Sequence, residues 1–382
     1  MRALVVDPGW SRGALAAVRS LGAAGWTVGL AVPDVTRGLA LHSRHIHAVH
    51  RVPAPDADPG GFPDAVRAAV QAGAYELVLA AGDAEVLALS ADRERIGAVV
   101  GYPEHALVSR LFDKLSLAEL ARESGVPTPS TRPADETALA AVRGPVMLKE
   151  RLHARGAGHG GGRVEARLVA GEAAAREGAE AIRAVGGDPV LQDVVDGALL
   201  SLALVRTREG QVVGRVQQRA ERVWPGPAGI SVRARTTAVD PALATSVERL
   251  LERLGWWGLV QAQLLAPADG PAQLIDLNGR CYGSLALARA SGVDLARLGA
   301  EAALGQPVAP AGDAPAGHRY QWLEGDLRRA AQARSIGELV GSLRYSRGAA
   351  HSIRDPGDPS PARHYAVALG RRALRKAARR GR

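Results

Sequence analysis

The chain has 382 residues, of which 47% are apolar, and this suits two or three domains with a sizeable core. No stretch approaches the roughly 18 unbroken apolar residues of a membrane-spanning helix, and the N-terminus lacks the apolar region of a signal peptide. Cys281 is the only cysteine, so an intrachain disulfide is excluded. We therefore expect a cytoplasmic protein with no membrane span.

The formal net charge of +9 is concentrated at the C-terminal end of the chain. Residues 363–382 contain eight basic residues and no acidic one, so they account for all but one of these charges. A basic tail of this kind could contact RNA or anionic lipid. The pattern favours a solvated terminal helix instead, and we do not expect nucleic acid as a partner.

The first part of the chain alternates between apolar strands and amphipathic helices. The alternation predicts a parallel sheet with crossover helices. No G-x-G-x-x-G motif follows the first strand, so we expect a Rossmann-like domain that does not bind NAD. The predicted elements are a strand at 2–6, a helix at 11–25, a strand at 26–32, a helix at 61–72 and a strand at 76–81.

Beyond residue 110 the pattern changes to short strands joined by tight turns, which is typical of antiparallel sheet. A Pro/Gly/Ala-rich stretch after Gln306 indicates a linker, followed by an Arg-rich helical region. The predicted helices are 111–124, 241–254 and 284–304, and the predicted strands are 145–150, 189–195, 201–207, 211–220, 258–265 and 272–278.

The segment IDLNGR carries the strongest chemical signal in the sequence. Asp276 and Asn278 lie two residues apart on a predicted strand, so both point to one face and offer oxygen ligands that suit Mg²⁺. An antiparallel partner strand would bring Gln263 beside them as a third oxygen ligand. Arg280 follows on the same face, where it would lie beside a metal-bound phosphate. Alternatively, Asp and Asn at a strand end simply form a turn.

Lysine is rare in this chain, since only Lys114, Lys149 and Lys376 occur among 48 basic residues. A lysine retained in so Arg-rich a chain indicates a place that needs a compact point charge rather than a planar fork. Lys149 ends an apolar strand and precedes the glycine-rich segment 156–162, whose backbone N–H groups could surround an anion. This predicts a phosphate-binding lid, although a flexible linker and a solvated lysine would give the same pattern.

The segment VLQDVVDG, residues 190–197, is a strand that ends in an acidic residue followed by a turn. Backbone groups of such a hinge can pair with the edge of an adenine ring. A plain strand and turn would look the same.

In this order, the segments resemble the motifs of the ATP-grasp superfamily, particularly its stand-alone carboxylate–amine ligases and the related biotin carboxylases and carbamoyl-phosphate synthetases. The matching motifs are Asp113-Lys114 with GVPTP at 125–129, then Lys149, the glycine loop 156–162, the hinge 192–197 and Asp276-x-Asn278-x-Arg280. The resemblance implies three regions: a Rossmann-like pre-ATP-grasp domain over 1–110, a two-lobed ATP-grasp fold with antiparallel sheets over 111–307, and a helical extension with the basic tail over 308–382.

The resemblance also implies a function. We expect an ATP-dependent ligase that joins a small-molecule carboxylate to an amine through an acyl-phosphate, uses Mg²⁺ or Mn²⁺, and forms a homodimer. Arg233 and Arg235 are further candidates for substrate or phosphate contacts. The implied roles are phosphate binding by Lys114 and Lys149, a phosphate lid of Gly156, Gly158, Gly160 and Gly161, adenine binding by Gln192, Asp193, Val194 and Val195, metal binding by Gln263, Asp276 and Asn278, and catalysis by Lys149 and Arg280.

The sequence departs from the family pattern at several of these positions. Gln263 and Asp276 stand where Glu is usual, and Gly279 stands where Pro is usual, which predicts a looser turn. A second hypothesis is therefore an ATP-grasp protein with weakened catalysis that binds nucleotide and regulates or scaffolds. A biotin-carboxylase-like subunit would need a separate biotin carrier, and attachment to RNA or membrane would act through the tail.

Overall fold

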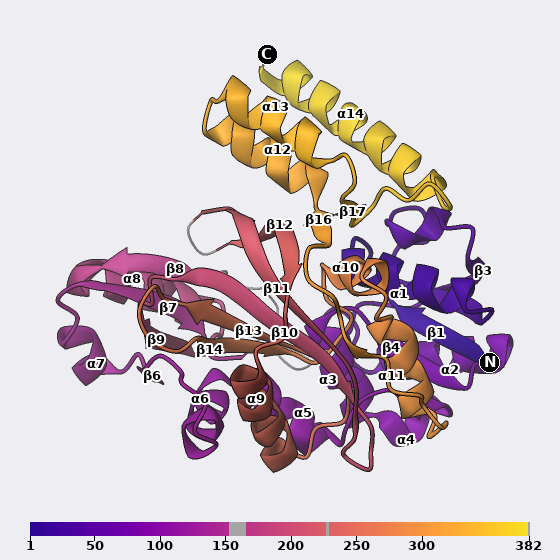
Figure 1. The fold of residues 1–382 in the computed structure, drawn as a ribbon, viewed down its shortest axis with the longest axis horizontal. Coiled ribbons are helices and arrows are strands. Elements are labelled where there is room, and N and C mark those ends of the chain that lie inside the picture. The colour runs from indigo at the N-terminus through magenta and orange to yellow at the C-terminus, as the bar shows by residue number, and fades with distance from the viewer. Residues whose placement is uncertain (153–165, 227–228, 381–382) are drawn as a thin grey trace.

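The computed structural model describes residues 1–152, 166–226 and 229–380. It is a mixed α/β fold with three sheets: a parallel N-terminal sheet, a small antiparallel sheet and a large, mainly antiparallel sheet (Figure 1). The large sheet runs through the middle of the molecule, between the N-terminal sheet and the small sheet (Figure 1).

The N-terminal sheet is five-stranded and parallel, in the order β3-β2-β1-β4-β5, which confirms the predicted sheet with crossover helices. The sequence analysis did not predict β3 or β5. In β3 only alternate residues are partly buried, because it is the edge strand. The elements are β1 (Arg2–Val6), α1 (Arg12–Ala23), β2 (Thr27–Val32), the 3₁₀ helix η1 (Ala40–His42), β3 (Ile46–Arg51), α2 (Gly61–Gly73), β4 (Leu77–Ala80), α3 (Asp83–Ala91), α4 (Arg93–Ile96) and β5 (Val99–Val100).

The helix predicted over 111–124 is in fact two helices, α5 (His105–Phe112) and α6 (Lys114–Glu123). Asp113 between them has an extended backbone and caps α6, because its carboxylate accepts hydrogen bonds from the backbone N–H groups of Leu115 and Ser116. A residue that caps a helix in this way lies outside it, so the single-helix prediction was wrong at this point.

The small sheet has the order β6-β9-β7-β8, with every neighbouring pair antiparallel as predicted. Its buried face packs against α8 through Leu148, Ala175, Ala179 and Ile182. The elements are β6 (Thr131–Pro133), α7 (Glu136–Ala140), β7 (Pro145–Glu150), β8 (Arg167–Ala170), α8 (Gly171–Ala184) and β9 (Pro189–Asp193).

The large sheet has the order β14-β13-β10-β11-β12-β16-β17, with β15 beside β11. Both of its faces are buried: Leu202 and Leu204 of β10 belong to one hydrophobic core with α9, and Ala203 and Val205 belong to another with α11. Gly292, with a φ of +90°, divides the predicted helix 284–304 into α10 and α11. The elements are β10 (Ala198–Arg206), β11 (Val212–Trp224), β12 (Ile230–Thr237), α9 (Pro241–Leu254), β13 (Gly258–Ala266), β14 (Gln273–Asn278), α10 (Leu285–Ala290) and α11 (Leu295–Ala303).

The C-terminal region contains the predicted helices, but it also contributes strands that the sequence analysis did not expect. β16 pairs antiparallel with β12 and β17 pairs parallel with β16, so this region extends the large sheet. Figure 1 shows its helices above the sheets, with the C-terminus at the top. No helix within the described ranges is long and apolar enough to cross a bilayer. The elements are β15 (Gly312–Asp313), β16 (Arg319–Gln321), α12 (Leu323–Gln332), α13 (Ile336–Tyr345), β17 (Ala350–His351) and α14 (Ser360–Arg380).

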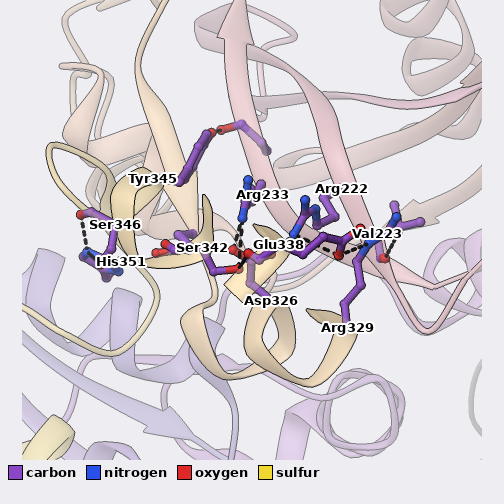
Figure 2. A network of polar contacts seen from close by, with 12 residues as sticks. Arg222, Val223, Arg233, Asp326, Arg329, Glu338, Ser342, Tyr345, Ser346 and His351 are labelled. Carbon is purple, nitrogen blue, oxygen red and sulfur yellow. Dashed lines mark hydrogen bonds and ion pairs between the residues drawn. The ribbon is translucent and has the colours of Figure 1, made fainter. Parts of the chain in front are cut away.

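A buried ionic network fastens α12 and α13 to the large sheet (Figure 2). Asp326 of α12 is fully buried and forms ion pairs with Arg222 at 3.1 Å and with Arg233 at 2.6 Å. Gln321 also donates to the Asp326 carboxylate, and Arg233 donates to the hydroxyl of Ser342. Both carboxylate oxygens of Asp326 are therefore hydrogen-bonded, which is what a buried charge requires.

A second buried ion pair joins the N-terminal domain to the segment before α14. Arg19 of α1 is 5% exposed, and its guanidinium lies 2.9 Å from the carboxylate of Asp358. The same guanidinium donates to the backbone oxygens of Ile353 and Asp358. Ser43, just after η1, donates to the Asp358 carboxylate as well. Burial raises the pKa of Asp358, but its hydrogen bonds, including those from Arg44 and Arg19, outweigh burial and hold the pKa below its usual value.

Candidate functional site

Strands β13 and β14 place the predicted metal ligands side by side. The two strands are antiparallel and Gln263 lies opposite Asp276, as the sequence predicted, and the register also places Gln261 opposite Asn278. Gln263, Asp276, Asn278 and Arg280 all line one pocket of about 290 Å³. The structure therefore brings these four predicted site residues together.

The amide groups beside this pocket are fixed by a chain of hydrogen bonds. Ser201 on β10 accepts from Gln261 at 3.3 Å, and the side-chain oxygen of Gln261 accepts from Asn278 at 3.3 Å. Arg280 then donates to the side-chain oxygen of Asn278 at 3.3 Å. This chain fixes which end of the Asn278 amide faces Arg280, because an amide nitrogen can only donate and its oxygen can only accept.

The three predicted metal ligands in the pocket offer oxygen atoms of the kind that bind Mg²⁺, namely the carboxylate of Asp276 and the amide oxygens of Gln263 and Asn278. Among the residues that the structure describes, no group of three or more His, Cys, Asp or Glu side chains could hold a metal ion. A cation at this position would therefore depend on Asp276, on the two amides and on phosphate oxygens from a ligand. The donor set fits Mg²⁺ carried by a nucleotide, and the metal-binding role stays a prediction.

Arg280 is held by an acidic residue of the N-terminal domain that the sequence analysis missed. Its Nε lies 2.5 Å from the carboxylate of Asp83, which is 9% exposed and begins α3. Burial alone would lower the pKa of Arg280, but the charge and hydrogen bond of Asp83, together with the charge of Asp276, outweigh burial and leave the pKa above its ordinary value. Asp83 thus keeps the guanidinium charged and oriented.

Two further acidic residues are buried in the same domain. Burial raises the pKa of Asp7 to about 6, although one of its oxygens accepts from the backbone N–H groups of Gly9 and Ser11. Burial raises the pKa of Glu85 to about 7, and the neighbouring charges of Asp83 and Asp7 add to this effect. Asp7 follows strand β1, and Asp83 and Glu85 follow strand β4. All three carboxylates therefore lie at the edge of the sheet that Arg280 approaches.

Close backbone packing fixes the segment after β14. A Cβ atom on Gly13 of α1 would lie 2.2 Å from the carbonyl oxygen of Cys281, and one on Gly279 would lie 2.3 Å from the indole of Trp256. The backbone N–H of Cys281 donates to Ala80 at the end of β4. Gly279 therefore makes room for the fully buried Trp256, and the looser turn stays a prediction.

On the small sheet, two predicted nucleotide-binding residues contact each other directly. The Nζ of Lys149 on β7 donates to the side-chain oxygen of Gln192 on β9 at 2.6 Å. The amide nitrogen of Gln192 donates to Thr131 on β6 at 2.9 Å. Gln192 is 5% exposed and is bonded at both ends of its amide, so it holds the ammonium group of Lys149 in place.

Lys114 lies at the start of α6, near the end of strand β7. Its backbone N–H donates to the carbonyl oxygen of Arg151, two residues after Lys149. The guanidinium of Arg151 pairs with Asp113 at 2.7 Å. Burial raises the pKa of Asp113, but the hydrogen bonds from Arg151, Leu115 and Ser116, together with the charge of Arg151, outweigh burial and keep the pKa below its usual value. The Asp-Lys motif is thus tied to the strand that carries the second predicted phosphate ligand.

The small sheet and the large sheet are joined next to these residues. The backbone N–H of Leu274 on β14 donates to Pro127 at 2.7 Å, and the hydroxyl of Thr128 donates to the carbonyl oxygen of Leu274 at 2.9 Å. The GVPTP segment that precedes the small sheet therefore packs against the strand that carries Asp276 and Asn278.

The remaining predicted residues are the hinge residues after Gln192 and the glycines of the predicted lid. Asp193 is exposed and pairs with Arg132 at 2.8 Å, while Val194, 42% exposed, and Val195 follow the end of β9. Gly156, Gly158, Gly160 and Gly161 lie outside the described residues.

Arg233 and Arg235 lie on β12 as predicted, but their side chains are engaged in ion pairs. Arg233 pairs with Asp326 in the buried network, and Arg235 pairs with Glu221 at 2.9 Å. The two arginines are not among the residues that line the 290 Å³ pocket. The charge of Arg233 thus fastens α12 to the sheet, and a contact of Arg233 or Arg235 with substrate stays a prediction.

A family model described as "ATP-grasp in the biosynthetic pathway with Ter operon" matches residues 190–326. A comparison with curated proteins finds no significant match.

Three of the solved structures similar to this chain come from different bacteria. The biotin carboxylase domain of the Hydrogenobacter thermophilus 2-oxoglutarate carboxylase, in complex with MgADP, has a TM-score of 0.65 at 14% identity over 83% of this chain and 73% of that one. The L-amino acid ligase from Bacillus licheniformis has a TM-score of 0.62 at 15% identity over 79% and 74% of the two chains. The N5-carboxyaminoimidazole synthetase from Staphylococcus aureus has a TM-score of 0.65 at 14% identity over 87% and 85%.

These neighbours share the arrangement seen here and confirm the predicted fold class. They are a carboxylase domain, a ligase and a synthetase. The family match covers the hinge and the metal strand, and together with the shared fold it agrees with the resemblance drawn from the sequence.

Proposed function

We propose that the protein is an ATP-dependent carboxylate–amine ligase that forms an amide bond and releases ADP and phosphate. The observation that supports this most is the shared pocket of Asp276, Asn278 and Arg280 on the large sheet of an ATP-grasp fold. Lys149 and Gln192 on the small sheet supply a second polar group for a bound nucleotide.

The proposed reaction has two steps. An oxygen of the substrate carboxylate attacks the γ-phosphorus of ATP, and the bond from that phosphorus to the bridging oxygen of ADP breaks. The amine nitrogen then attacks the carbonyl carbon of the acyl-phosphate, phosphate leaves, and the nitrogen loses a proton. Phosphoryl transfer of this kind depends on positioning and on stabilising negative charge.

Arg280 is suited to stabilise the transferring phosphoryl group and the acyl-phosphate. Its position is set before any ligand arrives, because Asp83 holds Nε and Asn278 accepts from an Nη atom. A preoriented guanidinium loses little conformational entropy when it binds an anion. Lys149, held by Gln192, would contact a phosphate oxygen, and Lys114 would contact another.

Gln263, Asp276 and Asn278 would hold Mg²⁺ or Mn²⁺ against the phosphates. When bound, the cation would neutralise phosphate charge and help to orient the γ-phosphate. The backbone of the hinge from Gln192 to Val195 would pair with the adenine edge.

A second candidate function is nucleotide binding with weak catalysis. The observation that favours it is the low charge of the metal ligand set, since only Asp276 is a carboxylate. Such a site binds Mg²⁺ less tightly than one built from two carboxylates.

The test is ADP release with Mg-ATP, screened against pooled amino acids and small carboxylic acids. A ligase gives release that one acid and one amine stimulate together. Lys149→Ala should reduce that release at least about a hundredfold, the scale of one lost electrostatic contact to the reacting group, while Lys376→Ala, which changes the lysine in the tail, should leave it unchanged. Near-normal release by the Lys149 variant would show that the phosphate role is wrong.

The metal assignment is tested in the same assay. Asp276→Asn should raise the Mg²⁺ concentration needed for half-maximal release, because it removes the one carboxylate from the ligand set. An unchanged Mg²⁺ titration would exclude Asp276 as a ligand. If ATP binds but no substrate pair stimulates release, the second candidate function is favoured.

A cytoplasmic location and a homodimer are part of the same proposal. The single buried cysteine supports the location, and size-exclusion chromatography with light scattering would test the dimer.

A further inference from the structure

A second, larger pocket adjoins the candidate site. It has a volume of about 990 Å³ and lies between the N-terminal domain, α12 and α14. Trp10 and Arg12 line this pocket and also line the 290 Å³ pocket of Asp276 and Arg280. The two pockets therefore share a wall at the start of α1, and a ligand in the larger one lies next to the proposed reaction centre.

Arg12 is an oriented cation at this junction. One of its Nη atoms donates to the hydroxyl of Tyr320 at 3.1 Å, and its guanidinium lies 4.1 Å from the centre of the Trp322 ring. Among the described residues, no carboxylate lies within ion-pair distance of Arg12. Its contacts hold the guanidinium in place but leave its charge uncompensated by any described acid, which suits the binding of an anion.

The rest of the larger pocket is basic and aromatic. Arginines approach it from three parts of the fold: Arg37 from the segment before η1, Arg328 from α12, and Arg363 and Arg371 from α14. The acidic residue in the lining is Glu324, and it is paired with Arg328.

Two aromatic contacts shape the pocket walls. Trp10 and Tyr365 of α14 lie 5.9 Å apart between ring centres, and Trp322 presents its ring to Arg12. Trp10 is 49% exposed and lines both pockets, so its ring offers apolar surface to a ligand. A planar apolar group would bury this surface.

From these observations we infer the substrate class, and the inference rests on the proposed ligase function. The acid substrate carries a planar apolar group, which lies against Trp10, Trp322 and α14 in the larger pocket. Its anionic group binds Arg12 at the junction, from where the carboxylate reaches the site of Arg280. A volume of this size suits a substrate much larger than a simple amino acid. The helix α14 thus forms a wall of the substrate pocket.

The test is calorimetric titration of the full-length protein without ATP, using benzoate, 2-naphthoate and indole-3-acetate. The matched probes are indole-3-acetamide, which lacks the charge, and acetate, which lacks the ring. At least one aromatic acid should bind about tenfold or more tightly than either type of control, the scale of one charge-assisted hydrogen bond or one buried ring. Arg12→Gln should remove that preference for the acid over its amide.

Two further variants keep the result interpretable. Arg328→Gln changes a 43% exposed residue on α12 and should weaken the binding of the acid without disturbing the fold. Arg176→Gln, on α8 and outside both pockets, should leave the affinity unchanged. The inference is overturned if none of the three acids binds, if the amide binds as tightly as the acid, or if Arg12→Gln binds the acid like the unchanged protein.

A separate titration with Mg-ATP distinguishes this inference from the proposed function. Binding of Mg-ATP without a preference for aromatic acids would overturn the substrate class and leave the ligase proposal standing. Arg12-dependent binding of the acid by a protein that binds no Mg-ATP would establish the pocket and refute the ligase proposal.

Discussion

Arg280 shows how single residues connect the N-terminal domain to the large sheet. Its guanidinium joins Asp83 of α3 to Asn278 of β14, two residues that are far apart in the chain. Removing one partner from a buried charge pair leaves the other uncompensated. Asp83 is therefore needed both to keep Arg280 in position and to keep the two domains in register.

Glu85, close to Asp83, should make the stability of the protein depend on pH. Its pKa in the folded protein is about 7, raised from 4.5 first by burial and then by neighbouring charges. A carboxyl group with a raised folded pKa stabilises the fold below its unfolded pKa, and this contribution is lost as the pH rises through the folded pKa. Between about pH 4.5 and 7.5 Glu85 should therefore reduce the free energy of unfolding by roughly 3 kcal/mol.

The measurement is urea unfolding of the protein and of Glu85→Gln across this pH range. The variant cannot ionise at position 85, so its stability should fall less as the pH rises. Glu94→Gln changes an exposed position on the neighbouring helix α4. Its free energy of unfolding should keep the full dependence on pH. Parallel pH curves for the protein and Glu85→Gln would show that Glu85 does not carry this effect.

At the scale of elements, the end of β14 is shaped by its packing against Trp256. Gly279→Ala would place a Cβ atom 2.3 Å from the indole ring, and Trp256 is fully buried and cannot move aside freely. Overpacking of this kind costs about 1–3 kcal/mol. The variant should lose that much stability in urea unfolding and should displace Arg280, the next residue.

Gly144→Ala is the matched control, because a Cβ atom there would meet nothing within 4 Å and the residue is not among those with positive φ. It should be close to neutral. Equal stability of the two alanine variants would show that the contact between Gly279 and Trp256 does not constrain the strand end.

The elements themselves could be predicted well where apolar residues alternate or recur regularly, and less well where polar contacts break a helix. The pattern 111–124 continues through Asp113, but the carboxylate of that residue bonds backbone N–H groups and ends one helix while it starts another. Gly292 similarly divides the pattern 284–304. Periodicity reports which face is buried, and it does not report which local hydrogen bonds form.

On the scale of the whole molecule, the C-terminal region depends on Asp326 for its attachment to the large sheet. Asp326→Ala would leave Arg222 and Arg233 without their shared buried partner, which typically costs about 3–5 kcal/mol. We expect urea unfolding to begin at lower concentration and limited proteolysis to cleave around α12 and α13. Asp269→Ala, at an exposed turn, should leave both unchanged, and an Asp326 variant that resists protease like this control would contradict the proposed attachment.

The candidate site could be predicted only where its residues are near one another in sequence or on paired strands. The pairing of Gln263 with Asp276 followed from two strands joined by a tight turn. Asp83 was missed because it comes from another domain, although an acidic residue just after the apolar strand 76–81 was a usable signal, since ligand sites often lie at the carboxyl ends of parallel strands. The wall formed by α14 was missed because a basic tail is equally consistent with a solvated helix.

The buried pair of Arg19 and Asp358 also has a consequence for the order of events during synthesis. The two residues are 339 positions apart, so Arg19 leaves the ribosome long before its partner exists. At about 5–20 residues per second, the interval is roughly 20 to 70 s. During that time α1 carries an unpaired guanidinium on a surface that is later buried, and the N-terminal domain acquires its final packing only when the segment around Asp358 arrives. A nascent chain stalled before residue 358 should therefore expose the surface around Arg19 to chaperones.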